Sequence, residues 1–554
     1  MVDLGPLACG YHDLALDAEG VLTTQRRIVT PERCPSVAEI AGRPRAFGIA
    51  AQLYAIRSRR NWGIGDAGDI DLLVDRAVAW GATFVGLNPL HALRNSGIDI
   101  SPYSPVSRLF GNWIYIDIAA VPEHDGSTPP DIDVLRSASR VDYDRIAVEK
   151  HAALRRAYAR FLDRASSERR NAAAAHRARG GRELEAFATF SVLTAAERRA
   201  YPRANAPGLA ALASARQEDI DFTCWLQFEL DRQLGHSADR ARERGLAIGL
   251  YQDLAIGCAP DGSDVWAHPE LFVTDVAIGA PPDDYSKEGQ NWGLPPMSPH
   301  RLRAEGYRYW STLLQRAFAN GGALRMDHVI GLFRQFWVPN GMSGTHGAFV
   351  TFPADDLLGI LALEASRARA VVVGEDLGTV PEEVTGVLAR YGVLSSRVLY
   401  FEVTDGEFHT SAKYAENALT TANTHDMAPL AGWLEGNDIS LRSRVGIIDP
   451  AAAEKAHSMR GIEAAALRRR LAAELGDDVP TEGRDLVRAV HAFLARTPST
   501  LVGVALDDIT GETEPVNVPG TNAEQHPSWR RRYSVALEDL PEAPAALPTE
   551  LRGR

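Results

Sequence analysis

The chain has 554 residues, 45% of them hydrophobic and 24% charged, which is the composition of a soluble globular protein longer than one ordinary domain. Its formal net charge of −13 disfavours contact with a phosphate backbone, so we expect no nucleic acid partner. The four cysteines are scattered and form no Cys-x-x-Cys pair, so they suggest neither a zinc ribbon nor a disulfide framework: Cys9, Cys34, Cys224 and Cys258.

The N-terminal segment carries acidic side chains where a signal peptide needs basic ones, and no uncharged apolar run in the chain approaches the length of a membrane span. We therefore expect a cytoplasmic protein with no membrane partner. Residues 1–45 contain short β-like stretches at 11–16, 21–24 and 27–30. These stretches predict a small β-rich N-terminal segment that packs on the main body.

From residue 46 onward, apolar strands alternate with amphipathic helices. Strands are expected to begin near residues 47, 83, 246, 322, 370, 397, 419 and 499, with the sixth spanning 397–403. Helices are expected at 66–80, at 302–320, from Pro381 and within 450–495. Eight strands, each but the last followed by a helix, predict a (β/α)8 TIM barrel.

The alternation stops between residues 120 and 243, which predicts a large helical insertion after the second barrel strand. Its apolar face is expected to contain Leu154, Tyr158, Phe161 and Leu162. The chain then divides into an N-terminal segment (1–45), barrel strands one and two (46–119), the insertion (120–243), the rest of the barrel with its active-site loops (244–540) and a C-terminal tail (541–554).

The loop before the first barrel helix matches the G-x-G-x-x-G pattern at residues 63–68. A dinucleotide site requires the strand to run directly into these glycines and the next strand to end in an acidic residue. Here residues 57–62 intervene and the next strand ends at Asn88, so the sequence disfavours such a site. The later turn at 101–105 has Tyr103 between two prolines, and it is either a rigid surface turn or a platform on which a ligand stacks.

Four acidic residues lie at the predicted C-terminal ends of barrel strands: Asp253, Asp327, Glu375 and Asp426. Any one of them could be a structural residue, but together they surround the end of the barrel where this fold carries its active site. Two chemistries suit such a group, namely a divalent metal site and glycosyl transfer or hydrolysis.

The side chains of Arg325 and Asp327 share one face of their strand, because residues two apart in a strand point the same way. The guanidinium would keep that carboxylate ionised, which favours a metal-free nucleophile over a metal ligand. Glu375 follows the apolar run 371–373 and stands beside Asp376. Both features would raise the pKa of Glu375, as a general acid/base requires.

The chain resembles the amylomaltases, the 4-α-glucanotransferase or disproportionating-enzyme family of the α-amylase superfamily, over roughly residues 47–529. The N-terminal segment resembles a shortened form of the extra region in the bacterial maltose-utilisation type. The motifs that carry the resemblance are RNWGIGD (60–66), NPLHAL (88–93), SPYSP (101–105), DVWAHPELF (264–272), PPDDYSKEGQNWG (281–293), ALRMDH (323–328), GEDLGTVP (374–381) and NTHD (423–426).

The resemblance implies that Asp327 is the nucleophile, Glu375 the acid/base and Asp426 a third catalytic carboxylate that holds the sugar ring. It implies further substrate-binding residues, which are Arg325, His328, His425, Asp253, Tyr103, Ser101, Tyr285, Asp283 and Trp292. Two positions depart from the family pattern. Met326 stands where Ile is commoner, and Ser528 stands where Asn is common, which leaves the role of the C-terminal loop open.

The implied reaction moves α-1,4-glucan segments from a donor to the 4-hydroxyl of an acceptor by retaining double displacement, without a metal or other cofactor. The implied partners are maltooligosaccharides, amylose or glycogen-derived glucans, and glucose as acceptor. Two alternatives remain. One is an α-amylase-like retaining hydrolase, and the other is an inactive glucan-binding protein, which would be expected to lack one of the three catalytic carboxylates.

Overall fold

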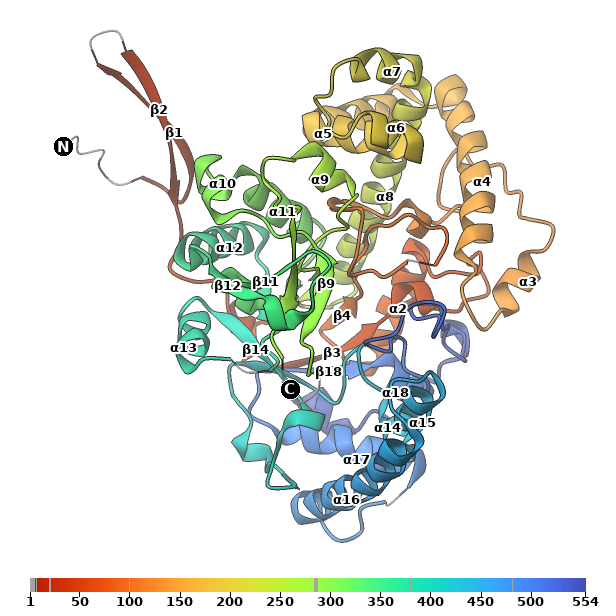
Figure 1. Ribbon diagram of the computed structural model, residues 1–554. Coiled ribbons are helices and arrows are strands. Elements are labelled where there is room, and N and C mark those ends of the chain that lie inside the picture. The colour runs from red at the N-terminus through yellow and green to blue at the C-terminus, as the bar shows by residue number, and fades with distance from the viewer. Residues whose placement is uncertain are drawn as a thin grey trace.

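The computed structural model describes the chain except for residues 1–4, 6, 19–20, 99, 283–286, 379 and 481. Its centre is a closed barrel of eight parallel strands, which confirms the predicted TIM barrel (Figure 1). Neighbouring strands in the barrel follow one another along the chain. They are β3 (Ala46–Ala51), β4 (Phe84–Leu87), β7 (Gly249–Leu254), β10 (Ala323–Met326), β13 (Val371–Gly374), β14 (Val393–Val398), β17 (Ala418–Thr421) and β18 (Leu501–Ala505).

The strands lie where the apolar runs predict them, with one exception. The sixth strand, β14, ends at Val398, and a 3-10 helix, Leu399–Phe401, follows it, so the predicted range 397–403 is wrong. The strand contains Ser395 and Ser396, which donate hydrogen bonds to the carboxylate of Asp376 from a hydroxyl and from a backbone N–H. Because these residues are polar, the strand lacks the apolar run that predicts a barrel strand. The more apolar residues after it have such a run, although they form the 3-10 helix.

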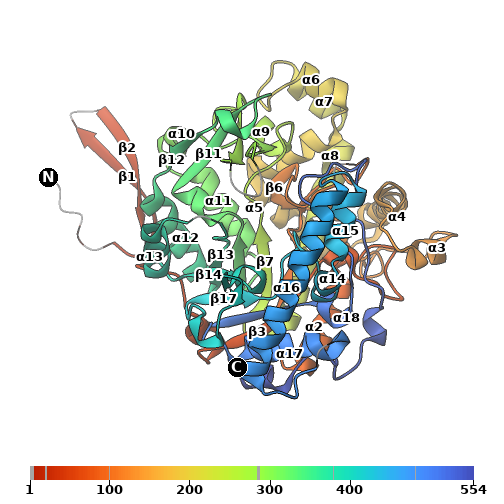
Figure 2. The same ribbon diagram turned by 60° about the horizontal axis from the view of Figure 1, so that its bottom comes forward.

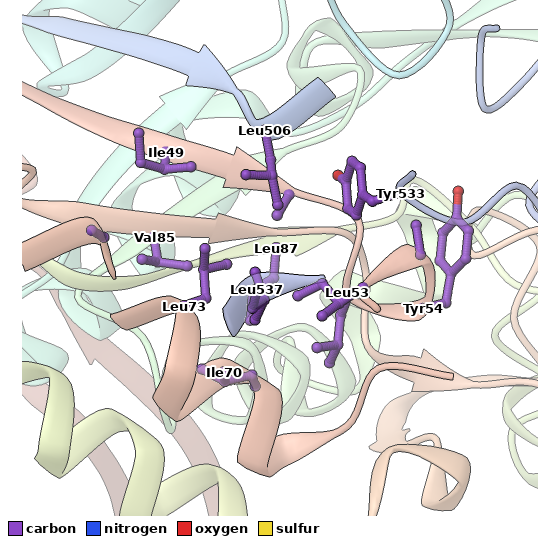
Figure 3. Packing of buried hydrophobic residues seen from close by; sticks show 14 of the residues in the cluster. Ile49, Leu53, Tyr54, Ile70, Leu73, Val85, Leu87, Leu506, Tyr533 and Leu537 are labelled. Carbon is purple, nitrogen blue, oxygen red and sulfur yellow. The ribbon is translucent and has the colours of Figure 1, made fainter. Parts of the chain in front are cut away.

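The first barrel helix, α2 (Ala67–Trp80), is confirmed, and the backbone N–H of Asp69 donates to the N-cap residue Asp66. Its apolar face, which consists of Ile70, Leu73, Val74 and Ala77, is fully buried. Ile70 and Leu73 pack below Val85 and Leu87 of the barrel, next to Leu537 of the C-terminal segment (Figure 3). The glycine-rich loop therefore leads into a structural helix of the barrel.

The remaining helices around the barrel are α10 to α18 in chain order. The predicted helix at 302–320 is two helices, because Gly306 and Tyr307 both have left-handed backbone angles, with φ of 66° and 57°. The bounds are α10 (Pro299–Ala304), α11 (Arg308–Phe318), α12 (Ala354–Ala368), α13 (Glu382–Arg390), α14 (Leu430–Glu435), α15 (Asn437–Arg444), α16 (Pro450–Leu475), α17 (Gly483–Arg496) and α18 (Leu506–Thr510).

Helices make up most of residues 132–243, within the predicted insertion, and they lie to one side of the barrel (Figures 1 and 2). In α4 (Tyr143–Arg164), Leu154, Tyr158 and Phe161 are buried, whereas Leu162 is half exposed and does not belong to the apolar face predicted for it. The helices are α3 (Ile132–Ser137), α4 (Tyr143–Arg164), α5 (Ser167–Val192), α6 (Ala195–Ala200), α7 (Leu209–Ala215) and α8 (Gln217–Glu243).

The N-terminal region is one long hairpin rather than three short pieces. β1 (Gly10–Ala18) pairs antiparallel with β2 (Val21–Val29), and the hairpin projects from the body in both views (Figures 1 and 2). At its base, the Tyr11 hydroxyl donates to Glu364 on α12, and the guanidinium groups of Arg26 and Arg367 lie over the Tyr11 ring. A short helix, α1 (Val37–Ala41), leads from the hairpin to the barrel.

A second sheet, which the sequence pattern does not predict, stands beside the barrel. It is antiparallel, in the order β12-β11-β8-β9, with β8 (Val276–Ala280), β9 (Gln290–Leu294), β11 (Arg334–Pro339) and β12 (Ala348–Thr351). Trp292 on β9 reaches the barrel mouth, where its ring contacts that of His328. Across the described part of the chain, none of the helices combines the length and the apolar character that a membrane span requires.

Candidate active site

The four predicted carboxylates gather at the C-terminal end of the barrel. Asp253 lies within β7, Asp327 and Glu375 each follow directly after a strand, and Asp426 lies in the loop after β17. Because parallel strands end on the same side, these residues surround one mouth. The side chains of Asp253, Arg325, Glu375 and His425 line a cavity of about 140 Å³ there.

Arg325 connects two of the carboxylates. Its Nη1 lies 2.8 and 3.1 Å from the two carboxylate oxygens of Asp253, and its Nη2 lies 2.9 Å from Oδ1 of Asp327. This confirms that Arg325 and Asp327 share a face of their strand. Burial alone would lower the pKa of Arg325, but Asp253, Tyr103 and Asp327 raise it well above its usual value. The guanidinium therefore stays charged and orients both carboxylates.

Glu375 is held by two backbone N–H groups. The N–H of Leu377 donates to its Oε1 at 2.8 Å, and the N–H of His328 donates to its Oε2 at 3.0 Å. Burial and the negative charge of Asp327 raise the pKa of Glu375 to about 6, although Arg325 and the two N–H groups act in the other direction. A carboxyl with this pKa can donate a proton or accept one near neutral pH.

The pKa of Glu375 is raised, as predicted. Burial is one predicted cause, but the second cause is the charge of Asp327 and not that of Asp376. The apolar run before Glu375 is buried, as expected. The negative charge that contributes is that of Asp327 across the site, whereas the neighbouring Asp376 accepts hydrogen bonds from Ser395 and Ser396 of β14. Asp376 therefore has a structural role between β13 and β14.

His328 has a left-handed backbone conformation, with φ of 49° and ψ of 56°, directly after Asp327. This conformation is uncommon for a residue other than glycine, and it accompanies the N–H that donates to Glu375. The imidazole meets the ring of Trp292 edge to face, with 5.2 Å between the ring centroids. Burial lowers the pKa of His328, so its ring is neutral at neutral pH.

An aromatic group closes one side of the mouth. The rings of Tyr103 and His425 stack with centroids 4.5 Å apart, and the ring of Trp529 lies 5.6 Å from both. The Tyr103 hydroxyl donates to Oδ2 of Asp253 at 2.6 Å. The hydroxyl of Ser101 accepts the N–H of Tyr103 at 3.2 Å, so it supports the turn that positions this tyrosine.

Asp426 is the most open of the four carboxylates, since its side chain keeps 47% of its surface exposed. Partial burial would raise its pKa, but His425 and a hydrogen bond of 2.7 Å from Nδ2 of Asn517 lower it to about 2. A second hollow of about 1030 Å³ extends from Asp426 along Trp292, Tyr400 and Asn517. The ionised Asp426 thus lies where the small cavity opens into a wide groove.

Two residues of this site, Asn517 and Trp529, are not predicted from the sequence. Both come from the C-terminal part of the barrel and lie near no predicted strand end. In the sequence, the stretch around Ser528 is the feature that could have drawn attention to them. The Ser528 hydroxyl accepts a hydrogen bond from the N–H of Val518, and the N–H of Trp529 donates to the carbonyl of Val516. These two bonds flank Asn517 and assign the C-terminal loop a structural part in the site.

Two predicted residues, Asp283 and Tyr285, lie outside the described residues. Among the residues that are described, no group of three or more His, Cys, Asp and Glu side chains has an arrangement that could hold a metal ion. The carboxylates of Asp253 and Asp327 are both engaged by Arg325.

Comparison with known proteins identifies the family. A family model described as 4-alpha-glucanotransferase matches residues 51–538, which is most of the chain. The chain belongs to the 4-alpha-glucanotransferase family. It is an enzyme of this transferase class, and its family includes the amylomaltases.

Several relatives align with nearly the whole chain. The 4-alpha-glucanotransferase of Mycobacterium tuberculosis is 37% identical over 561 residues, covering 95% of this chain and 76% of the relative. That of Haemophilus influenzae is 33% identical, covering 97% of this chain and 82% of the relative. Amylomaltase from Corynebacterium glutamicum superimposes with a TM-score of 0.88 at 33% identity, over 99% of this chain and 80% of that structure. A Streptococcus agalactiae amylomaltase in complex with acarbose has the same fold, with a TM-score of 0.73 at 20% identity, over 92% of this chain and 98% of that structure.

Proposed function

We propose that this 4-alpha-glucanotransferase moves α-1,4-glucan segments from a donor to the 4-hydroxyl of an acceptor glucan or glucose by retaining double displacement. The observation that carries the proposal is the pair of carboxyl groups at the mouth with different environments. Asp327 is bound by the cationic Arg325, whereas Glu375 has a pKa raised to about 6 by burial and by Asp327. One ionised and one protonated carboxyl are what glycosyl transfer with retention requires.

In the first half of the reaction, a carboxylate oxygen of Asp327 attacks the anomeric carbon of the donor sugar. The bond from that carbon to the glycosidic oxygen breaks, and Glu375 gives its proton to the departing 4-oxygen. A glycosyl ester of Asp327 forms. For this direct attack, we expect the two carboxyl groups to lie roughly 5–5.5 Å apart.

In the second half, the ionised Glu375 accepts the proton of the incoming 4-hydroxyl, and that oxygen attacks the anomeric carbon and releases Asp327. Asp426, ionised and partly exposed beside His425 and Asn517, is positioned to accept hydrogen bonds from sugar hydroxyls. Such bonds stabilise the transition state if they strengthen as the ring distorts. We assign Arg325, His328, His425, Asp253, Tyr103, Ser101 and Trp292 to the surrounding sugar subsites.

The substrates we propose are maltooligosaccharides and amylose or glycogen-derived glucans, with glucose as the smallest acceptor. We propose that the enzyme acts on them in the cytoplasm. The groove that leads from Asp426 past Trp292 and Tyr400 supports a chain-like substrate, because it continues well beyond the small cavity at the carboxylates. Aromatic side chains along a polar groove suit the apolar faces of sugar rings.

The products of maltotriose test this function. We expect glucose and longer maltooligosaccharides with little change in the total number of reducing ends, and we expect Asp327→Asn to abolish both. A steady rise in reducing ends without longer products would show a hydrolase instead. Binding of maltotriose without any turnover would show a glucan-binding protein. The Asp539→Asn variant, whose exposed carboxylate pairs with Arg59 at the surface, is the matched control for loss of one charge.

A further inference from the structure

Gln52 lies at the catalytic mouth, on the side opposite Glu375. It follows directly after β3, as Glu375 follows β13. In the closed barrel, three strands separate β3 from β13 in either direction, namely β14, β17 and β18 on one side and β4, β7 and β10 on the other. The two residues therefore end strands that stand across the barrel from each other, and both line the cavity of about 140 Å³.

The backbone at Gln52 is held on both sides. Its N–H donates to the Tyr533 hydroxyl at 3.0 Å, and that hydroxyl donates to Oδ2 of Asp507 at 3.2 Å. The N–H of the next residue, Leu53, donates to Oδ1 of Asn88 at 2.7 Å. A side chain on a fixed backbone at the end of a barrel strand is well placed to make a precise contact with a ligand.

One end of the Gln52 amide is available for a ligand. Its Oε1 is buried, and no group in the described part of the chain donates a hydrogen bond to it. The buried glutamines Gln227 and Gln233 differ, since each accepts a backbone N–H with Oε1 and donates from Nε2 to the carbonyl of the same residue, Gly111 and Asp117 respectively. Because buried polar groups are almost always paired, the Gln52 oxygen indicates a contact with a ligand or with solvent.

The cavity offers a second polar atom of this kind. Tyr251 lies on β7 two residues before Asp253, so its side chain shares the face of Asp253 and lies deeper in the barrel. Its hydroxyl is buried and likewise has no hydrogen-bond partner among the described residues. A cavity that combines charged groups with two such polar atoms suits a ligand rich in hydroxyl groups.

We propose that Gln52 is a substrate-contacting residue whose amide binds a hydroxyl of the donor sugar, namely the sugar whose anomeric carbon Asp327 attacks. The inference rests on the proposed function. Because Arg325 and Glu375 line the same cavity, a sugar seated there meets Gln52 on its other side. The contact selects a sugar with a hydroxyl at that position, and it fixes the ring relative to the acid/base.

The test uses maltosyl fluorides, whose fluoride leaves with little help from the acid. Initial rates of fluoride release are compared between the intact compound and analogues that lack the 2-, the 3- or the 6-hydroxyl on the sugar that bears fluorine. In Gln52→Met, whose side chain has a similar length but no amide, we expect kcat/KM for the intact compound to fall roughly tenfold. The penalty for losing one particular hydroxyl should shrink by a similar factor, because its contact is already gone.

This coupling to one hydroxyl separates a contact from a merely structural role, because a variant that only disturbs the site would slow all of the fluorides by the same factor. If Gln52→Met does not fold, Gln52→Asn provides the same comparison, since it withdraws the amide by one methylene and keeps its polarity. Gln25→Met changes an exposed glutamine on β2. It is the matched control and should leave every rate at the wild-type value.

Two results would overturn the inference. One is a folded Gln52 variant that slows the intact fluoride and every analogue by the same factor. The other is a variant with wild-type rates, which would show that the amide contacts solvent alone. A wild-type enzyme that releases fluoride without transferring a maltosyl group to any acceptor would instead refute the proposed function, so the two failures are distinct.

Discussion

At the scale of single residues, the site depends on which carboxylates the Arg325 guanidinium contacts. Its guanidinium contacts Asp253 and Asp327 and only opposes, at a distance, the rise in the pKa of Glu375. Sequence alone predicts the Arg325–Asp327 pair, because alternation along a strand is a firm geometric rule. It could not predict that Asp376 points away, since only the three-dimensional pairing of β13 with β14 decides this.

The pKa of Glu375 predicts the pH dependence of the reaction. Donor cleavage needs the protonated acid, and this form is lost as the pH rises through about 6. We therefore expect kcat/KM for maltotriose to decline above about pH 6. A profile of initial rates from pH 4 to pH 9 measures this limb.

Replacement of Glu375 provides the control for the decline in kcat/KM above about pH 6. In Glu375→Gln, a glycosyl fluoride should still be cleaved, because fluoride leaves with little help from a proton. Its rate should then lack the decline near pH 6. If the decline persists in this variant, another group causes it.

At the scale of elements, the barrel strands are readable because both of their faces are buried and their sequences are nearly continuous apolar runs. The strands of the β8–β9 hairpin cannot be predicted from apolar runs in this way. Its strands are short and β9 is mostly exposed, so the sequence around 281–293 resembles a loop. Asn517 and Trp529 are missed for a related reason, since irregular segments position them and no periodic pattern marks such segments.

The buried Asp508 anchors the loop that carries His425 and Asp426. Both of its carboxylate oxygens accept from Nδ2 of Asn423, at 3.1 and 3.2 Å, and the N–H of Leu430 donates to it at 2.8 Å. We expect Asp508→Asn to lower the free energy of unfolding by about 1–3 kcal/mol, because an amide cannot accept all of these bonds. It should also lower kcat, because the loop moves.

Denaturant unfolding and initial rates measure the two effects of Asp508→Asn separately. The exposed Asp539 is a useful comparison, since its pairing with Arg59 should contribute no more than about 1 kcal/mol. A wild-type kcat in Asp508→Asn would show that the anchor serves stability alone.

At the scale of the whole molecule, counting strands predicts the barrel, and the break in the alternation predicts the insertion, because both depend on long stretches of chain. The N-terminal hairpin is harder to foresee. Its strands pair with each other and its base contacts α12, while the hairpin projects from the body (Figures 1 and 2). Nothing in an alternating pattern distinguishes a packed hairpin from a projecting one.

The arrangement of the mouth also predicts the metal dependence of the enzyme. Two of its carboxylates are bound by Arg325, a cation that would repel a divalent ion from the same oxygens. We expect full transferase activity after exhaustive treatment with EDTA. A large loss that calcium or magnesium restores would contradict this expectation.

The central claim is that Asp327 forms a glycosyl ester which Glu375 then helps an acceptor to discharge. The most direct measurement is to incubate the Glu375→Gln variant with a maltosyl fluoride and to map the modified peptide by mass spectrometry. Fluoride leaves without an acid, and the ester persists without a base. We predict one added maltosyl group on the peptide that contains Asp327 and none in Asp327→Asn. A label on another residue, or an unlabelled enzyme that releases a product of inverted anomeric configuration, would contradict the account.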